Sequence, residues 1–223
     1  MSTAVQCTLS VVAHETLGTG GFKTAHAATL LQASSDGLAT LTRHFSGSSV
    51  VAKRPFLKPA GSRTISRYPA IDEVQHLINE CNLTYWATAL LQMTYRFIDA
   101  VQSSAGNAPF PIPKIRFVRA GFAYALAGPK DPGRAIPLTR LKKADSLSPS
   151  VLRGYMLEER IEGEFTKFVH NANPFPCMKE GEWGYATAQF LCFTQHAQYQ
   201  LTQGNAIISD YQGTQKHFFE VLY

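Results

Sequence analysis

The chain has 223 residues, of which 45% are hydrophobic and 17% charged, and its formal net charge is +5. This length and apolar content predict a folded protein with a sizeable core, built as one large domain or two small lobes, and exclude a disordered tail. The basic residues are spread in short groups such as Lys53-Arg54. This pattern favours an anionic ligand over a nucleic-acid partner, because nucleic-acid-binding arms carry longer basic runs.

The cysteine spacing and the apolar runs bear on the cellular compartment. Four cysteines lie far apart, without the paired spacing of a zinc motif or a disulfide framework, and we interpret them as thiols in a reducing compartment. The N-terminus lacks a basic stretch followed by an apolar segment, and no run of about eighteen apolar residues occurs. We therefore expect a soluble, intracellular protein in the cytoplasm, with no membrane partner.

The N-terminal part of the sequence predicts several short strands. β-branched and apolar residues favour strands over residues 5–13, 23–31, 38–44 and 49–54, separated by turn residues. The turn before the second strand contains Gly20-Gly21. Glycines without a Cβ let backbone amides approach a phosphate closely, although a plain hairpin turn explains them equally.

Lys53 closes the last of these strands, and a long helix follows. A lysine in this position can place its ammonium over a bound phosphate, or can simply extend from the surface. Apolar residues recur at helical spacing over residues 71–101. Glu73 and Glu80 share one flank of this helix, and either can reach Lys53 as an ion-pair partner, unless both are solvated.

The C-terminal part predicts a strand over residues 114–124, a strand that begins at Tyr155 and turns at Gly163, and a helix over residues 185–194. The strand that ends in a glycine is typical of a hinge between lobes, with backbone groups at its edge free to bind a purine base.

A predicted strand over residues 206–209 then leads into Asp210-Tyr211-Gln212-Gly213. A carboxylate and an amide directly after an apolar strand are commonly placed to hold a metal or to orient a nucleophile. A turn that contains the Asp and the Gly is the alternative.

The order of these features is that of a two-lobed phosphotransferase, although the His-Arg-Asp and Asp-Phe-Gly signatures of the usual protein kinases are absent. With the glycine turn, Lys53, the long helix, the hinge strand and the 210–213 loop in this order, the sequence resembles the alpha-kinase family, and most closely its fungal members. The resemblance covers nearly the whole chain. It implies an α+β, two-lobed atypical protein-kinase-like fold, with an N-terminal lobe over residues 1–108 and a C-terminal lobe over residues 109–223.

The resemblance also implies roles for residues of the N-terminal lobe and the hinge. Lys53 would contact the phosphates of ATP. Gly20, Gly21 and Lys23 would belong to the loop that covers them. Glu158 would lie in the hinge beside the adenine.

In the C-terminal lobe, the resemblance implies that Asp210 is the catalytic aspartate, which orients the substrate hydroxyl and accepts its proton. Gln212 would be a ligand of Mg²⁺, which prefers oxygen donors. A metal-binding aspartate of the family falls at Glu220, where this sequence differs in residue and in context. His196 corresponds to one ligand of a structural zinc in the family, but the later ligands are missing here, so we expect no zinc.

The leading hypothesis from the sequence is an ATP- and Mg²⁺-dependent serine/threonine protein kinase that transfers the γ-phosphoryl group to a protein hydroxyl. The alternative is a catalytically impaired pseudokinase that binds a nucleotide or acts as a scaffold, because the C-terminal metal segment is altered. A basic RNA-associated protein is a third, weaker reading.

Overall fold

In the computed structural model of the protein, the structure describes residues 5–33, 35–62, 64–126, 136–137, 150–214 and 218–220. The chain forms two compact units. Unit 1 comprises Met1–Cys81 and Arg119–Arg160, and unit 2 comprises Asn82–Val118 and Ile161–Tyr223. Each unit therefore combines two separate segments of the chain, which differs from a single boundary near residue 108.

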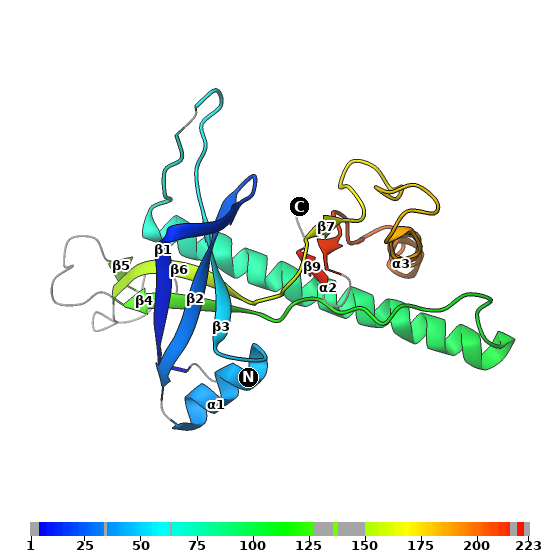
Figure 1. Ribbon diagram of the computed structural model, residues 1–223, viewed down its shortest axis with the longest axis horizontal. Coiled ribbons are helices and arrows are strands. Elements are labelled where there is room, and N and C mark those ends of the chain that lie inside the picture. The colour runs from blue at the N-terminus through cyan, green and yellow to red at the C-terminus, as the bar shows by residue number, and fades with distance from the viewer. Residues whose placement is uncertain are drawn as a thin grey trace. The chain divides into compact units, whose positions relative to one another are not determined.

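Unit 1 is built on an antiparallel sheet, whose strands are seen side by side in Figure 1. The strands follow the order β1 (Cys7–Thr19), β2 (Lys23–Ala33), β3 (Ser49–Pro55), β6 (Ser150–Glu159) and β4 (Ala120–Leu126), and β5 (Ile136–Pro137) also pairs with β6. Strand β6 thus inserts between β3 and β4, although about a hundred residues of sequence separate it from β3. The sheet therefore brings residues of β2, β3 and β6 next to one another.

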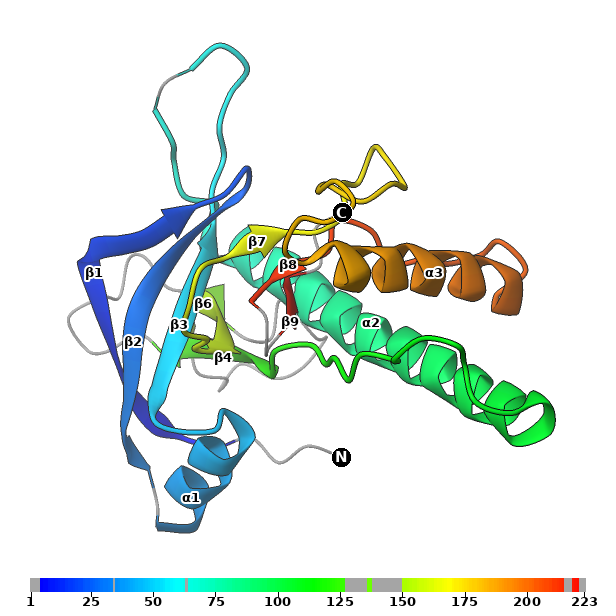
Figure 2. The same cartoon turned by 45° about the vertical axis from the view of Figure 1, so that its right-hand side comes forward.

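The helix α1 (Ser35–His44) connects β2 to β3 and packs against β2 (Figure 2). Leu38, Leu41 and Phe45 contact the core of the sheet, and their spacing of three and four residues places them on one face of a helix. Asp36 in the first turn and Arg43 in the last turn suit the helix dipole. The predicted strand over residues 38–44 is therefore wrong.

The core of unit 1 follows the alternation of its strands. Val50 and Ala52 of β3 are fully buried against Phe45, whereas Val51 and Lys53 face the other side of the sheet, because successive side chains of a strand alternate. The predicted strands over residues 23–31 and 49–54 are confirmed. The first strand continues past residue 13 to Thr19, and β4 begins only at Ala120.

The helix α2 (Ala70–Ala105) confirms the long helix predicted over residues 71–101. Its first turns belong to unit 1 and the rest to unit 2. In unit 1, the buried carboxylate of Glu73 accepts two hydrogen bonds from Arg54, at 2.8 and 3.0 Å, and one from the backbone N–H of Gly154. A Cβ at Gly154 would lie 2.7 Å from Leu77 Cδ1, so the close approach of β6 to α2 requires a glycine at this position.

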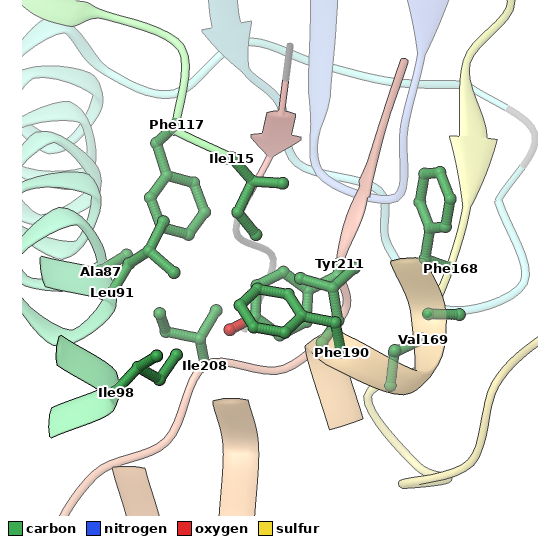
Figure 3. Packing of buried hydrophobic residues seen from close by; sticks show 12 residues of the cluster. Ala87, Leu91, Ile98, Ile115, Phe117, Phe168, Val169, Phe190, Ile208 and Tyr211 are labelled. Atoms are coloured by element: carbon green, nitrogen blue, oxygen red, sulfur yellow. The ribbon is translucent and has the colours of Figure 1, made fainter. Parts of the chain in front are cut away.

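Unit 2 contains the remainder of α2, the helix α3 (Tyr185–Leu201) and a small antiparallel sheet in the order β7 (Thr166–Lys167), β8 (Gln212–Gly213) and β9 (Phe218–Glu220). Figure 3 shows its core, in which Ile208 and Tyr211 pack with residues of α2 and α3, of the segment that follows α2, and of the segment that follows β7. The core residues are Ala87, Leu91, Ile98, Ile115, Phe117, Phe168, Val169, Ala188, Phe190, Leu191, Ile208 and Tyr211. No helix in the described part of the chain is long and apolar enough to cross a membrane.

The predicted helix over residues 185–194 is confirmed and extends to Leu201. The strand predicted over residues 206–209 is wrong, because this segment pairs with no strand in the described structure. Its backbone instead bonds to side chains of α3. For example, the N–H of Ile208 donates to Gln198 Oε1 at 2.9 Å.

Candidate functional site

Lys53 and Glu158 form an ion pair on the sheet of unit 1. Lys53 Nζ lies 2.7 Å from Glu158 Oε2, and both side chains are about nine-tenths buried. Lys53 is the register partner of Met156 on β6, two residues from Glu158, so the two side chains lie diagonally on the same face of adjacent strands. Glu158 was not predicted as the partner of Lys53, because no local pattern in the sequence places β6 beside β3.

Lys23 lies on the same face of the sheet. Ala25 is the register partner of Lys53, so Lys23, two residues earlier on β2, projects to the same side as Lys53. Lys23 Nζ lies 2.9 Å from Glu80 Oε2 of α2. Both acids that the sequence analysis placed on one flank of the helix therefore bind cations of unit 1, with Glu73 on Arg54 and Glu80 on Lys23.

The pKa of Cys81 is influenced by residues of both ion pairs. The pKa of its thiol is raised to about 11, chiefly by burial and then by the carboxylates of Glu80 and Glu158, while Lys23 acts against them. Both carboxylates thus lie within electrostatic range of one thiol. The two ammonium–carboxylate pairs form a single charged region in unit 1, which we call the lysine face and define by Lys23, Lys53, Glu80 and Glu158.

The glycine turn lies at the end of the strands that carry the lysine face. The N–H of Gly20 donates to the carbonyl of Lys23 at 2.9 Å and closes a tight turn before β2. A Cβ built on Gly21 would meet no described atom within 4 Å, and one on Gly20 would only touch the carbonyl of Lys23. The described protein leaves the space beside these backbone groups open.

The backbone of Glu158 lies inside the sheet. Glu158 is the register partner of Val51 on β3 and of Ala120 on β4. Both sides of β6 are therefore paired at Glu158, so any free backbone edge of the hinge lies beyond the end of β6 at Glu159. The boundary between the units follows at Arg160.

In unit 2, Asp210 forms an ion pair with Lys167. Lys167 Nζ lies 2.5 Å from Asp210 Oδ1, and Asp210 is only 2% exposed. Its backbone has φ of 60°, in the left-handed region, where a non-glycine residue is uncommon and strained. Among the described residues, Oδ1 has no donor in hydrogen-bond geometry, so the contact with Lys167 is electrostatic.

The loop that carries Asp210 is tied to β7 on its C-terminal side. The carbonyl of Tyr211 accepts hydrogen bonds from the N–H groups of Phe168 and Val169 at 2.8 and 3.3 Å. Gln212 is the register partner of Lys167. Lys167 and Asp210 are therefore held from two neighbouring segments of the backbone.

The sheet of unit 2 also brings Gln212 and Glu220 together. Gln212, half-buried on β8, is the register partner of Glu220 on β9. Lys167, Gln212 and Glu220 thus lie in one row across three strands. The sequence predicted Gln212 and Glu220 as metal ligands, and the fold places them at neighbouring positions.

His196 is exposed on α3. The described residues contain no group of three His, Cys, Asp or Glu side chains arranged to hold a metal ion. The cysteines Cys7, Cys81, Cys177 and Cys192 are free thiols.

Lys167 was not among the site residues predicted from the sequence. Nothing in the local sequence marked this lysine as a site residue. It follows the acidic stretch around Glu162 and Glu164, and it belongs to a strand of only two residues. Only the pairing of β7 with β8 brings it to Asp210. A search for a cation near the 210–213 loop would have needed this long-range register.

The sequence matches the model of the alpha-kinase family over residues 18–222. Among solved structures, the alpha-kinase domain of myosin heavy chain kinase A in complex with AMP is similar, with 13% identity, a TM-score of 0.57 and coverage of 97% of this chain and 76% of that chain. The same domain in complex with ADP gives 13% identity, a TM-score of 0.55 and coverage of 97% and 73%. An alpha kinase from Entamoeba histolytica gives 15% identity, a TM-score of 0.56 and coverage of 96% and 62%.

At these identities the structural matches show a shared α+β fold, in agreement with the fold expected from the sequence. No curated protein matches the sequence.

Proposed function

Because the chain belongs to the alpha-kinase family, we propose that it is an ATP-dependent serine/threonine protein kinase, which transfers the γ-phosphoryl group of ATP to a protein hydroxyl. The observation that carries the proposal is the ion pair between partly exposed Lys167 and buried Asp210, whose backbone is left-handed. Structural neighbours that bind AMP and ADP support a nucleotide as the ligand.

The lysine face of unit 1 supports nucleotide binding. Phosphoryl transfer depends on neutralising the charge of the phosphates and on positioning the reactants. Lys53 would contact these phosphates, and Glu158 would hold its ammonium in place, which the 2.7 Å ion pair supports. Lys23 would contribute a second ammonium at the start of β2.

The glycine turn would cover the phosphates. Gly20 and Gly21 leave open space where a Cβ would otherwise stand. The N–H of Gly20 already donates to Lys23, so the amide of Gly21 is the one that would approach an anion. The adenine contact of Glu158 stays a proposal that rests on the resemblance.

Asp210 would act on the accepting hydroxyl. An aspartate at this point can orient the hydroxyl and accept its proton as the phosphoryl group transfers. Lys167, which touches Asp210 Oδ1, would then balance negative charge on the phosphoryl group as it is transferred. These two roles make unit 2 the source of the groups that act on the protein substrate.

Two residues of unit 2 carry oxygen donors that a magnesium ion would use. Carboxylate and amide oxygens are the ligands that Mg²⁺ prefers, and the register places Gln212 beside Glu220. Gln212 and Glu220 would hold the ion, which would neutralise phosphate charge when bound.

Incorporation of labelled phosphate into a generic basic protein tests the proposed activity. We expect Lys53→Ala and Asp210→Ala to lose about a hundredfold or more in rate. Lys58→Ala, at an exposed lysine of the same unit as Lys53, should retain wild-type activity. Acid hydrolysis of the product should yield phosphoserine or phosphothreonine.

If the wild type and both site variants are equally inactive, the kinase proposal fails. A thermal shift with ATP in that case, with and without Mg²⁺, would favour a nucleotide-binding pseudokinase. That alternative draws on Glu220, which stands where the family carries an aspartate.

A further inference from the structure

One face of α3 carries polar side chains that bond to the chain returning toward Asp210. We call this set the α3 polar face and define it by Thr194, Gln195, Gln198 and Thr202. Gln198 follows Thr194 by four residues and Gln195 by three, and Thr202 at the C-cap follows Gln198 by four, so these side chains lie on one side of the helix. Their partners in the returning chain are Ala206, Ile208 and Tyr211, in the reverse order.

Gln198 and Gln195 replace a strand partner for Ile208. The N–H of Ile208 donates to Gln198 Oε1 at 2.9 Å, and its carbonyl accepts from Gln195 Nε2 at 2.8 Å. Both glutamines are buried, and Gln198 is fully buried. A buried backbone needs partners for both of its polar groups, and here two glutamine side chains supply them.

Gln198 also reaches the other side of Asp210. Its Nε2 donates to Thr94 Oγ1 of α2 at 3.4 Å and to the hydroxyl of Tyr211 at 3.5 Å. One amide therefore contacts the residues at positions 208 and 211, which flank Asp210 in the sequence. It also connects α2, α3 and the loop within unit 2.

Tyr211 is fixed by further contacts. Its hydroxyl donates to Thr194 Oγ1 at 2.9 Å, because the proton of that threonine already goes to the carbonyl of Leu191. Its ring stacks on Phe117 with 6.4 Å between centroids. Burial of the ring raises the pKa of the phenol, so Tyr211 stays a neutral donor in the core seen in Figure 3.

Asp210 lies between these two fixed points with φ of 60°. Such a conformation persists only where the surrounding structure determines it. We infer that Gln198 is a positioning residue for Asp210, which bonds to the backbone of Ile208 on one side and to the hydroxyl of Tyr211 on the other, so that the carboxylate meets Lys167. This inference deepens the proposed function and rests on it for the role of Asp210.

The test compares Gln198→Met with Gln200→Met. Methionine keeps the length of the side chain and removes the amide. Gln200 is exposed on the same helix, so its replacement controls for the chemical change and for helix propensity. Steady-state kinetics and amide hydrogen exchange of residues 206–213 are measured for both variants and the wild type.

We expect kcat to fall by about a hundredfold in Gln198→Met, because a small displacement of a reacting group has effects of this size. The KM for ATP should change by less than about threefold, since the lysine face belongs to unit 1. Exchange at the Ile208 amide should accelerate about tenfold or more, as its acceptor is removed. Gln200→Met should match the wild type in all three measurements.

Thr202→Val supplies a second comparison. It removes the hydrogen bond from the N–H of Ala206 to the Thr202 hydroxyl, and Ala206 lies further from Asp210 in the sequence than Ile208 does. If it lowers kcat as much as Gln198→Met does, the inference is wrong and the polar face only stabilises the fold. Unchanged exchange at Ile208 in Gln198→Met would also overturn it. An inactive wild type would remove the proposed function, whereas the exchange data would still decide whether Gln198 fixes the loop.

Discussion

Lys167 Nζ lies 2.5 Å from Asp210 Oδ1. Lys167 belongs to β7, and its register partner on the neighbouring strand β8 is Gln212. The lysine therefore touches the loop at the carboxylate and is held beside it by backbone pairing. A cation held this way costs little reorganisation when negative charge develops nearby. Three features converge on Asp210, which are this cation, burial and a left-handed backbone.

Replacement of Lys167 tests its role next to Asp210. We expect Lys167→Met to lower kcat by about a hundredfold, because the variant removes a preorganised charge. Lys179→Met, at an exposed lysine of the same unit, should stay within about twofold of the wild type. Steady-state phosphate transfer is the measurement, and equal activity of both variants would contradict a role for Lys167.

Glu73 of α2, which contacts Arg54 of β3 and Gly154 of β6, predicts a loss of stability in Glu73→Gln. Arg54 and Glu73 form a bidentate pair, and Glu73 is 1% exposed. The substitution leaves the guanidinium beside a neutral group, so the free energy of unfolding should fall by about 3 kcal/mol. Asp72→Asn, at the exposed neighbouring position, should cost at most about 1 kcal/mol.

Denaturant unfolding of both variants measures this difference. A loss in Glu73→Gln no larger than that in Asp72→Asn would contradict the importance of the buried pair.

Gly154 predicts a steric effect at the same contact. An added Cβ would lie 2.7 Å from Leu77 Cδ1 and 3.3 Å from Val74 Cγ2, so Gly154→Ala should destabilise the protein by about 1–3 kcal/mol. Gly18→Ala, where a Cβ meets no described atom within 4 Å, should have little effect. Thermal unfolding compares the two variants, and equal melting temperatures would mean that α2 and β6 do not approach as closely as described.

Local patterns in the sequence predicted the elements that depend on near neighbours. The helix over residues 71–101 followed from apolar spacing, and the strands over residues 23–31 and 49–54 followed from β-branched and apolar residues between turns. The same patterns misassigned residues 38–44, where Leu38, Leu41 and Phe45 fit a helix face once α1 can pack on the sheet. Short apolar runs favour either structure until their tertiary contacts are known.

Long-range pairing accounts for what the sequence could not predict in the candidate site. Glu158 reaches Lys53 only because β6 inserts beside β3, and Lys167 reaches Asp210 only because β7 pairs with β8. Residues 206–209 look like a strand because they are apolar and extended between turns. Glutamine side chains of α3 take the place of the strand partner, and no local pattern indicates this.

The raised pKa of Cys81 predicts a loss of stability at high pH. The folded thiol has a pKa of about 11 against an ordinary value of 9.0, so it stays protonated where the unfolded chain already ionises. This contribution to stability is fully present below pH 9, declines between pH 9 and 11, and is lost above pH 11. The difference in free energy of unfolding between the wild type and Cys81→Ala should shrink over this window.

Cys177→Ala, at an exposed cysteine, controls for titration of the other groups. Burial also raises the pKa of the Cys177 thiol, but this side chain is exposed, so the difference for Cys177→Ala should change less from pH 8 to 10 than the difference for Cys81→Ala. A flat difference for Cys81→Ala over the same range would show that Cys81 ionises normally in the folded protein.

The row formed by Gln212 and Glu220 predicts how activity depends on magnesium. Gln212→Leu keeps the size of the side chain and removes its oxygen, so the Mg²⁺ concentration for half-maximal activity should rise about tenfold, as expected for one lost ligand bond. Glu220→Gln should raise this concentration as well, because a neutral oxygen binds the cation more weakly than a carboxylate. Glu220→Asp keeps the charge and should bind Mg²⁺ at a concentration closer to that of the wild type than Glu220→Gln does. Titration of activity with Mg²⁺ at saturating ATP separates these variants, and identical titration curves for all of them would place the metal ligands elsewhere.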